Sequence, residues 1–207
     1  MTLNSRFTGS FLLLGMLLFL ASCNDSINNL SAEIYAMGGF SPAALARDGL
    51  AIAPVEPGDG TKAEASTLSG LLDSEIGGRL AQDHLLTSAM VQRRLASDVT
   101  LNAEWKVIAP HISAHSIKGM EATRAFTRRL GVRYLLESQI QYAEVGGGAE
   151  QVRFFSRIYD LRLHRIVWEG TGESRGYEKL FFPATPAPFL TVARAAVKGL
   201  ADRLFDN

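Results

Sequence analysis

Apolar residues recur along the chain with several different periods, and each period predicts a type of secondary structure. A continuous apolar run at residues 49–55 stops in the proline- and glycine-containing loop 56–60, as a buried strand of an α/β sheet does. The next apolar positions recur every four residues, which is the spacing of an amphipathic helix. These positions are Leu68, Leu72, Ile76 and Leu80. The pattern therefore predicts a strand followed by a helix that packs on it.

The middle of the chain carries weaker signals. Residues 85–90 predict a short second strand, and residues 91–96 predict the opening of a brief helix. Residues 98–110 are predicted to be a polar connection. It leads to a further helix whose solvent-facing side is rich in arginine. This helix is predicted to begin with Ser116 as its N-cap and to end before Gly131, which suits the left-handed position after a helix.

The last third of the chain alternates apolar and polar residues with a period of two. Residues 132–142, 152–158 and 165–169 are predicted to form an antiparallel meander, with a hairpin turn at the glycine run 146–148. A long apolar stripe then predicts a terminal helix, with Thr185 as its N-cap. The expected fold class is α/β: a mixed sheet with helices packed on it, a C-terminal antiparallel meander and a terminal helix.

The amino terminus has the pattern of a lipoprotein signal. Arg6 supplies positive charge, residues 11–20 form an apolar stretch, and the only cysteine, Cys23, directly follows the Leu-Ala-Ser of residues 20–22. This order resembles the lipobox of bacterial lipoproteins, which implies that Cys23 becomes a lipid-modified amino terminus. The predicted partner is therefore a membrane, reached through the lipid at Cys23.

The alternatives to lipidation are a membrane-spanning helix and a plain secretory signal with another cleavage point. A spanning helix needs about 20 apolar residues, which disfavours the first. We expect a signal at residues 1–22, a tether at 23–48 and one α/β domain at 49–207. Asn24 after the cysteine resembles an outer-membrane sorting signal, which implies the periplasmic face of that membrane; the inner membrane remains an alternative.

Charge and cysteine content exclude several classes of protein. Removing residues 1–22 takes away one arginine and no acid, so 20 basic and 21 acidic side chains remain. A nearly neutral domain lacks the concentrated positive charge that nucleic-acid binding requires. With Cys23 acylated, no thiol remains for a disulfide or a thiolate metal site, so stability is expected to come from ordinary packing.

The order of elements resembles a small α/β domain of bacterial envelope proteins. The matching segments are residues 50–55, residues 125–136 and the meander at 154–168, and they are similar to the curli-secretion lipoprotein, the amino-terminal domain of the TolB translocation protein and related auxiliary lipoproteins. The resemblance implies a non-enzymatic part of an envelope assembly. The chain departs from the family at Glu137 and Ser138, where a glycine is frequent, and it lacks long hairpins for a membrane barrel.

One catalytic motif occurs by pattern. Residues 172–176 match G-x-S-x-G, the nucleophile elbow of serine hydrolases, which would make Ser174 the nucleophile. That motif needs a helix after it and a histidine further along, and no histidine follows His164. A lipid-anchored hydrolase using Ser174 is thus the alternative to a non-catalytic protein.

Two histidines and two phenylalanines complete the candidate residues. His111 and His115 lie four residues apart, but the surrounding residues favour an exposed loop over a zinc site, so no metal or other cofactor is expected. Phe181 and Phe182 begin a proline-punctuated loop that either fills the core or contacts a partner. We expect a binding component of an export, polysaccharide-secretion or transport machine, with an envelope protein or further copies of the chain as partner. A module that binds a small or lipidic ligand is a third possibility.

Overall fold

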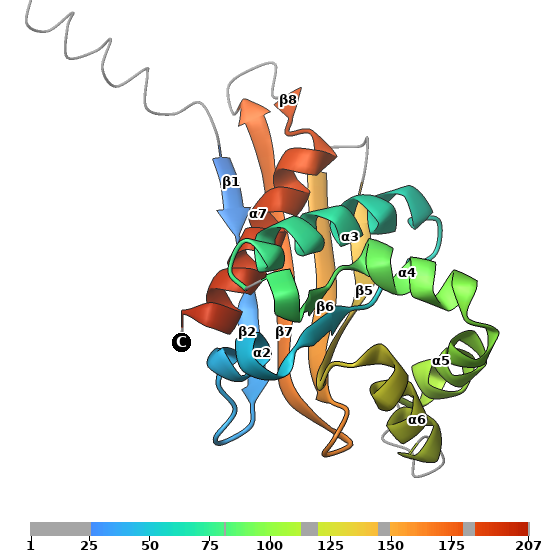
Figure 1. Ribbon diagram of the computed structural model, residues 1–207. Coiled ribbons are helices and arrows are strands. Elements are labelled where there is room, and N and C mark those ends of the chain that lie inside the picture. The colour runs from blue at the N-terminus through green and yellow to red at the C-terminus, as the bar shows by residue number, and fades with distance from the viewer. Residues whose placement is uncertain (1–25, 81, 113–119, 145–149, 180–184, 207) are drawn as a thin grey trace, which may run out of the picture.

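The computed structural model describes residues 26–80, 82–112, 120–144, 150–179 and 185–206. Its strands belong to one mixed sheet that carries helices on both faces (Figure 1). The strands are β1 (Ser26–Asn29), β2 (Ala32–Ala36), β3 (Leu50–Ile52), β4 (Leu85–Leu86), β5 (Tyr134–Glu144), β6 (Glu150–Asp160), β7 (Arg165–Lys179) and β8 (Thr185–Pro186). The helices are α2 (Pro42–Asp48), α3 (Lys62–Gly77), the 3₁₀ turn η1 (Gln82–His84), α4 (Ser88–Ser97), α5 (Val99–Ile112), α6 (Met120–Leu130) and α7 (Phe189–Phe205).

The sheet joins a parallel half to an antiparallel half. Its strand order is β1-β7-β6-β5-β3-β4, with β3 parallel to both β4 and β5. Strands β5, β6 and β7 form the antiparallel meander, and β1 and β2 both pair with β7, as does β8. The predicted fold class, a mixed sheet with helices, a meander and a terminal helix, is confirmed.

Helices cover the two faces of the sheet unequally. Helices α3 and α7 cross one face (Figure 1), and their apolar stripes pack with Leu136, Phe154 and Trp168 in the larger core. Helices α4, α5 and α6 lie beside the parallel half, where Leu135 and Phe126 belong to the second core. As a result, the first five residues of β5 are all buried, whereas among its last six residues only Ile140 is buried.

Several elements follow the sequence pattern closely. Strand β3, helix α3, the three meander strands and α7 lie where the apolar periods predict them. Gly131 follows α6 with a φ of 78°, and its N–H donates to the Thr127 carbonyl at 3.0 Å, as a left-handed residue after a helix does. Ser116 and the glycine run 146–148 lie outside the described residues.

The tether predicted for residues 23–48 is wrong for the part that the structure describes. Strands β1 and β2 add to the edge of the sheet along β7, and α2 buries Leu45 completely. The sequence pattern does not show this because every residue of β2 is exposed, so the strand has no apolar alternation. Backbone pairing with β7 holds it in place instead.

Three boundaries in the middle and end of the chain also differ from the prediction. The polar connection at residues 98–110 is helix α5, whose Leu101, Trp105 and Ile108 recur at helical spacing and pack in the second core. Strand β4 is only two residues long, and α4 already begins at Ser88, capped by the Thr87 hydroxyl. Thr185 belongs to β8, and α7 has Pro188 at its N-cap position instead. Across the described part of the chain, the helices are too short or too polar to span a membrane.

Candidate functional site

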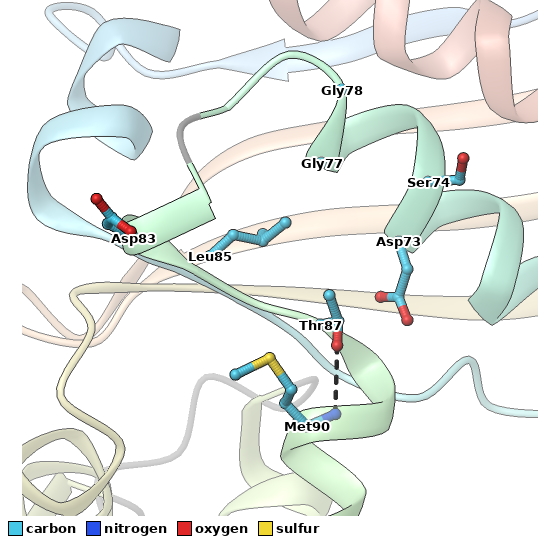
Figure 2. Close-up of a pocket in the computed structure, with 8 residues that line it drawn as sticks. All are labelled: Asp73, Ser74, Gly77, Gly78, Asp83, Leu85, Thr87 and Met90. Carbon is cyan, nitrogen blue, oxygen red and sulfur yellow. Dashed lines mark hydrogen bonds between the residues drawn. The ribbon is translucent and has the colours of Figure 1, made fainter.

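A groove of about 700 Å³ opens at the β4 edge of the sheet, between the end of α3 and the segment that leads into α4 (Figure 2). Its described lining residues are Asp73, Ser74, Gly77, Gly78, Asp83, Leu85, Thr87 and Met90. Gly77 leaves space for the Leu85 side chain, since a Cβ at that glycine would lie 3.2 Å from the leucine Cδ2. The groove therefore combines an apolar floor with a polar rim and suits a small amphipathic group.

One of the two carboxylates that line this groove, Asp73, has a structural role. Asp73 accepts a hydrogen bond from the Ser88 N–H and another from the Ser88 hydroxyl, both at 2.7 Å. Because both carboxylate oxygens accept hydrogen bonds from Ser88, Asp73 fastens α3 to the first turn of α4.

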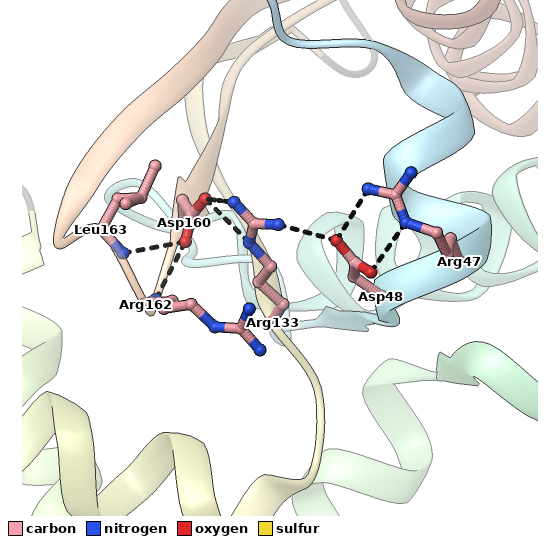
Figure 3. A network of polar contacts seen from close by, with 6 residues as sticks. All are labelled: Arg47, Asp48, Arg133, Asp160, Arg162 and Leu163. Carbon is pink, nitrogen blue, oxygen red and sulfur yellow. Dashed lines mark hydrogen bonds and ion pairs between the residues drawn. The ribbon is translucent and has the colours of Figure 1, made fainter.

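An arginine-centred network joins three elements at the opposite end of β5 from the hairpin (Figure 3). Arg133 donates to Asp160 from Nε at 3.0 Å and from Nη2 at 2.8 Å, and to Asp48 from Nη1 at 2.7 Å. Arg47 donates two further hydrogen bonds to Asp48, at 3.0 and 3.1 Å. The network thus ties the end of α2 and the end of β6 to the start of β5; we call it the Arg133 network.

The pKa values in the Arg133 network agree with a permanently charged clamp. Hydrogen bonds from Arg47, and then from Arg133, hold the pKa of Asp48 at about 2. The hydrogen bond to Asp160 is the main cause that raises the pKa of Arg133 above its ordinary value. Asp48 and Arg133 are therefore charged near neutral pH, which excludes them as proton donors or acceptors in that range.

Asp160 also shapes the turn between β6 and β7. Its Oδ1 accepts the backbone N–H groups of Arg162 and Leu163, each at 2.9 Å. The turn lies against α6, and a pocket of about 340 Å³ separates them. The described residues that line this pocket are Thr127, Arg128, Leu161, Arg162 and His164. We call this space the basic pocket.

Glu137 lies on the sheet face that α3 and α7 do not cover, next to Arg157. The residue is only 7% exposed, and its Oε2 lies 3.6 Å from Arg157 Nε. Burial raises the pKa of Glu137 to about 7, Arg157 opposes this rise, and Glu56 adds to it. Glu137 is therefore a carboxyl group that changes charge near neutral pH, and Gln139, Phe155 and Arg157 lie around it.

The structure describes only some of the residues predicted as sites. Cys23, Phe181, Phe182 and His115 lie outside the described residues, and the side chain of His111 is not described either. Lipidation at Cys23 and partner contact at Phe181 and Phe182 stay predictions. Over the described ranges, no group of three or more His, Cys, Asp or Glu side chains is placed to hold a metal ion.

Ser174 does not lie on a nucleophile elbow. Residues 172–176 are part of the continuous strand β7, and Ser174 is fully buried. Its hydroxyl has no hydrogen-bond partner among the described residues. Because the motif needs an exposed serine on a sharp turn between a strand and a helix, the geometry removes the support for the hydrolase alternative.

Sequence analysis did not single out Arg133, Asp160 or the basic pocket. One signal was present: Asp160 opens the turn after a predicted strand, where an aspartate side chain commonly accepts the next backbone N–H groups. No local signal pairs it with Arg133, because Asp48 and Asp160 are 85 and 27 residues away from that arginine.

Comparisons with known proteins identify the fold. No family model matches the sequence, and no curated protein matches it. Among solved structures, the PelC dodecamer from Paraburkholderia phytofirmans is similar with a TM-score of 0.51 at 15% identity, over 87% of this chain and 96% of that one. Lipoprotein GNA1162 from Neisseria meningitidis is more weakly similar, with a TM-score of 0.39 at 11% identity, over 62% of this chain and 80% of that one. The C-terminal domain of LpoB from Salmonella enterica has a TM-score of 0.31 at 15% identity, over 66% of this chain and 86% of that one.

The similarity to PelC extends over nearly the full length of that chain, so the two proteins share a fold. The small α/β fold that the sequence pattern predicted is therefore also the fold of PelC. The specific likeness to the curli-secretion lipoprotein and to TolB stays a prediction.

Proposed function

We propose that this protein is a lipid-anchored, non-catalytic component of a bacterial envelope assembly, held at the periplasmic face of the outer membrane. It acts by binding, in an export, polysaccharide-secretion or transport machine. The observation that supports this most is the shared fold with PelC, which forms a dodecamer. The lipobox at Cys23 supports the anchor.

The position of the first strand favours close attachment to the membrane. Strand β1 begins at Ser26, so only Asn24 and Asp25 separate the proposed lipid attachment point from the sheet. Three extended residues span about 10 Å. A lipid on Cys23 would therefore hold the β1 end of the sheet against the bilayer surface, with no long tether between them.

The edge formed by β2 is the surface we propose for assembly with further copies of the chain. None of the described strands pairs with the outer edge of β2, and the large apolar residues Leu30, Ile34 and Tyr35 are 47%, 56% and 43% exposed there. Exposed apolar edge strands are templates for pairing with another chain. The opposite end of the sheet, at β4, is also an edge. When two different surfaces of neighbouring copies meet head to tail, the copies form a closed ring if the rotation from one copy to the next closes.

The oligomeric state of the full chain tests the assembly. Native mass spectrometry of the detergent-purified protein should show one closed oligomer, and Ile34→Lys should reduce it to monomers. Val99→Lys is the matched control, since Val99 is 84% exposed on α5, away from β2. A monomeric wild type, together with no cross-linked partner in native envelopes, would refute the proposal.

The anchor is tested separately. Growth with an alkyne-labelled palmitate should label the wild-type chain in a bacterial host and leave Cys23→Ser unlabelled. A labelled Cys23→Ser chain, or an unlabelled wild type, contradicts lipidation at this residue.

A small-ligand-binding lipoprotein is the second candidate function, and the groove beside α3 is the observation that favours it. Leu85→Trp would fill this groove from its floor. If the groove binds a lipidic ligand, that substitution abolishes the ligand that co-purifies with the wild type, as detected by mass spectrometry of organic extracts.

A further inference from the structure

We propose that the basic pocket between α6 and the β6–β7 turn binds an anionic group, a phosphate or a carboxylate, of a ligand. Arg128 enters the pocket from α6, and Arg162 and His164 enter it from the turn. The other described lining residues are Thr127 and Leu161. None of the described lining residues is acidic, and the two arginines come from separate elements.

Within the described part of the chain, the two arginines of the pocket have no acidic partner. Arg128 and Arg162 make no side-chain ion pair or hydrogen bond with any residue in the described ranges, and Arg162 extends without a contact to the acids of the Arg133 network (Figure 3). The neighbouring Arg129 behaves differently, because it pairs with Glu104 at 3.3 Å and with Asp98 at 3.8 Å. Uncommitted guanidinium groups offer planar forks that match carboxylate and phosphate oxygens.

Asp160 is the acid of the turn, and it does not cancel this charge. Its carboxylate is 1% exposed and is bound by Arg133 at 2.8 Å, while its Oδ1 accepts backbone N–H groups of the turn. Arg133 therefore binds the carboxylate of the turn, and within the described ranges Asp160 makes no contact with the side chain of Arg128 or Arg162.

The turn is preorganised for binding. Leu161 is 1% exposed and fixes one side of the turn in the second core. His164 has a φ of 53° and is the one non-glycine residue of the described chain in the left-handed region. Residues held in this region outside glycine cluster at binding sites, because the surrounding structure must keep them there. A fixed turn loses little conformational entropy when an anion binds.

The volume and position of the basic pocket limit its ligands. About 340 Å³ is at the lower end of ligand pockets, so the site suits one anionic group with a small attached moiety. The pocket lies far from the end of the sheet where β1 begins. Ser26 of β1 pairs with Tyr177 of β7, and β7 starts twelve residues earlier at Arg165, next to the β6–β7 turn, so about 40 Å along β7 separates the two. The inference does not depend on the anchor at Cys23 or on assembly through β2.

Titration of the full-length protein in nanodiscs with inorganic phosphate, at constant ionic strength, tests the site. Saturable binding is expected, with shifts of the Arg128 and Arg162 side-chain NMR signals. The double variant Arg128→Gln with Arg162→Gln should weaken phosphate affinity by about tenfold or more, since charge-assisted hydrogen bonds are lost. Glucuronate as a second probe should compete with phosphate for the same signals.

The control is Arg175→Gln with Arg194→Gln, which removes the same charge from two exposed arginines on β7 and α7. This control should bind phosphate like the wild type. Equal weakening in both double variants would show a general charge effect and overturn the proposal, as would a wild type without saturable binding. Matching urea unfolding midpoints for all three proteins exclude misfolding as the cause.

Added lipid vesicles distinguish the two sources of the anion, because the distance of about 40 Å between the β1 end and the turn separates the pocket from the bilayer that holds the chain. If anionic headgroups of a second membrane occupy the pocket, phosphate affinity falls when phosphatidylglycerol vesicles are added, compared with phosphatidylcholine vesicles, and only in proteins with Arg128 and Arg162. If the ligand is a soluble anion, the affinity is equal in both. Either result supports the site, whereas a lipid effect that persists in the Arg128→Gln, Arg162→Gln variant contradicts it.

Discussion

Strand β5 runs from a half of the sheet that helices cover on both faces into a half that they cover on one. In the first half, residues on both sides of the strand are buried, and the charges at its border are combined in the Arg133 network. In the second half, the uncovered face carries ion pairs such as Arg153 with Glu173, where the arginine side chain is 49% exposed. Similar pairs of residues thus have different tasks, because water solvates the charges in one half and cannot do so in the other.

Glu137 lies where the two halves meet. It is nearly as buried as Asp160, yet its contact is one arginine at 3.6 Å, whereas Asp160 has two arginine contacts at 2.8 and 3.0 Å and two backbone donors. Glu137 thus has too few donors to offset its burial, and burial raises its pKa.

Removing Arg133 should have the largest effect. Arg133→Ala leaves the carboxylate of Asp160, 1% exposed, without its guanidinium partner. Breaking a buried pair on one side costs about 3 to 5 kcal/mol of unfolding free energy. Urea unfolding measures this loss, and Arg133→Lys should recover only part of it, since lysine keeps the charge without the fork. A loss below about 1 kcal/mol would show that the network behaves like a surface pair.

The covered face of β7 should tolerate little added volume. Gly172 faces the Phe154 ring, and a Cβ there would lie 2.2 Å from the ring's Cζ. Gly172→Val should therefore cost about 3 kcal/mol through overpacking. The control is Gly70→Ala on α3, where no atom lies within 4 Å of the added Cβ and the better helix propensity of alanine should stabilise the protein by about 0.5 to 1 kcal/mol. If both variants unfold at the same urea concentration, the packing argument is wrong.

Glu137 should make stability depend on pH at the border between the two halves. Its folded pKa of about 7 lies above its ordinary value of 4.5, so the folded state binds the proton more tightly than the unfolded state. This contribution is complete below pH 4.5, and it is lost as pH rises to 7. The full difference is about 3 kcal/mol.

Glu137→Gln removes this ionisation. As the pH rises from 4 to 8, the wild type loses this contribution and the variant does not. The unfolding free energy of the variant minus that of the wild type should therefore increase by about 2 to 3 kcal/mol over that range. Urea unfolding across that range, with an NMR titration of the Glu137 carboxyl carbon, provides the measurement. Parallel stability curves for the two proteins would refute the raised pKa.

The smallest effect should come from the uncovered face. Arg153→Ala breaks the pair with Glu173, whose atoms lie 3.4 Å apart, but water replaces the lost contact. We expect a change of about 0.5 kcal/mol or less, measured by urea unfolding and reduced further by added salt. A loss as large as that of Arg133→Ala would abolish the distinction between the two halves.

Particular residues show why part of the fold was predictable. The four-residue spacing from Leu68 to Leu80 and the period-two alternation in the meander are local patterns. They arise because one stripe of the helix and one face of each strand are buried, so α3 and β5 to β7 can be predicted from the sequence. Strand β2 was missed because all of its side chains are exposed and only backbone pairing to β7 makes it a strand. Helix α5 was missed because Asp98 and Asn102 around its start and Pro110 near its end are typical of a loop, although Leu101, Trp105 and Ile108 recur at helical spacing.

The candidate sites divide in the same way. The lipobox around Cys23 is a contiguous pattern, so sequence alone predicts the attachment chemistry, and apolar periodicity alone determined the fold class. The burial of Ser174 in β7, the Arg133 network, the raised pKa of Glu137 and the basic pocket were decided only by the tertiary structure. The physical reason is that charge and solvation depend on which distant residues meet: Arg128 and Arg162 form one pocket because the second core packs α6 beside the β6–β7 turn.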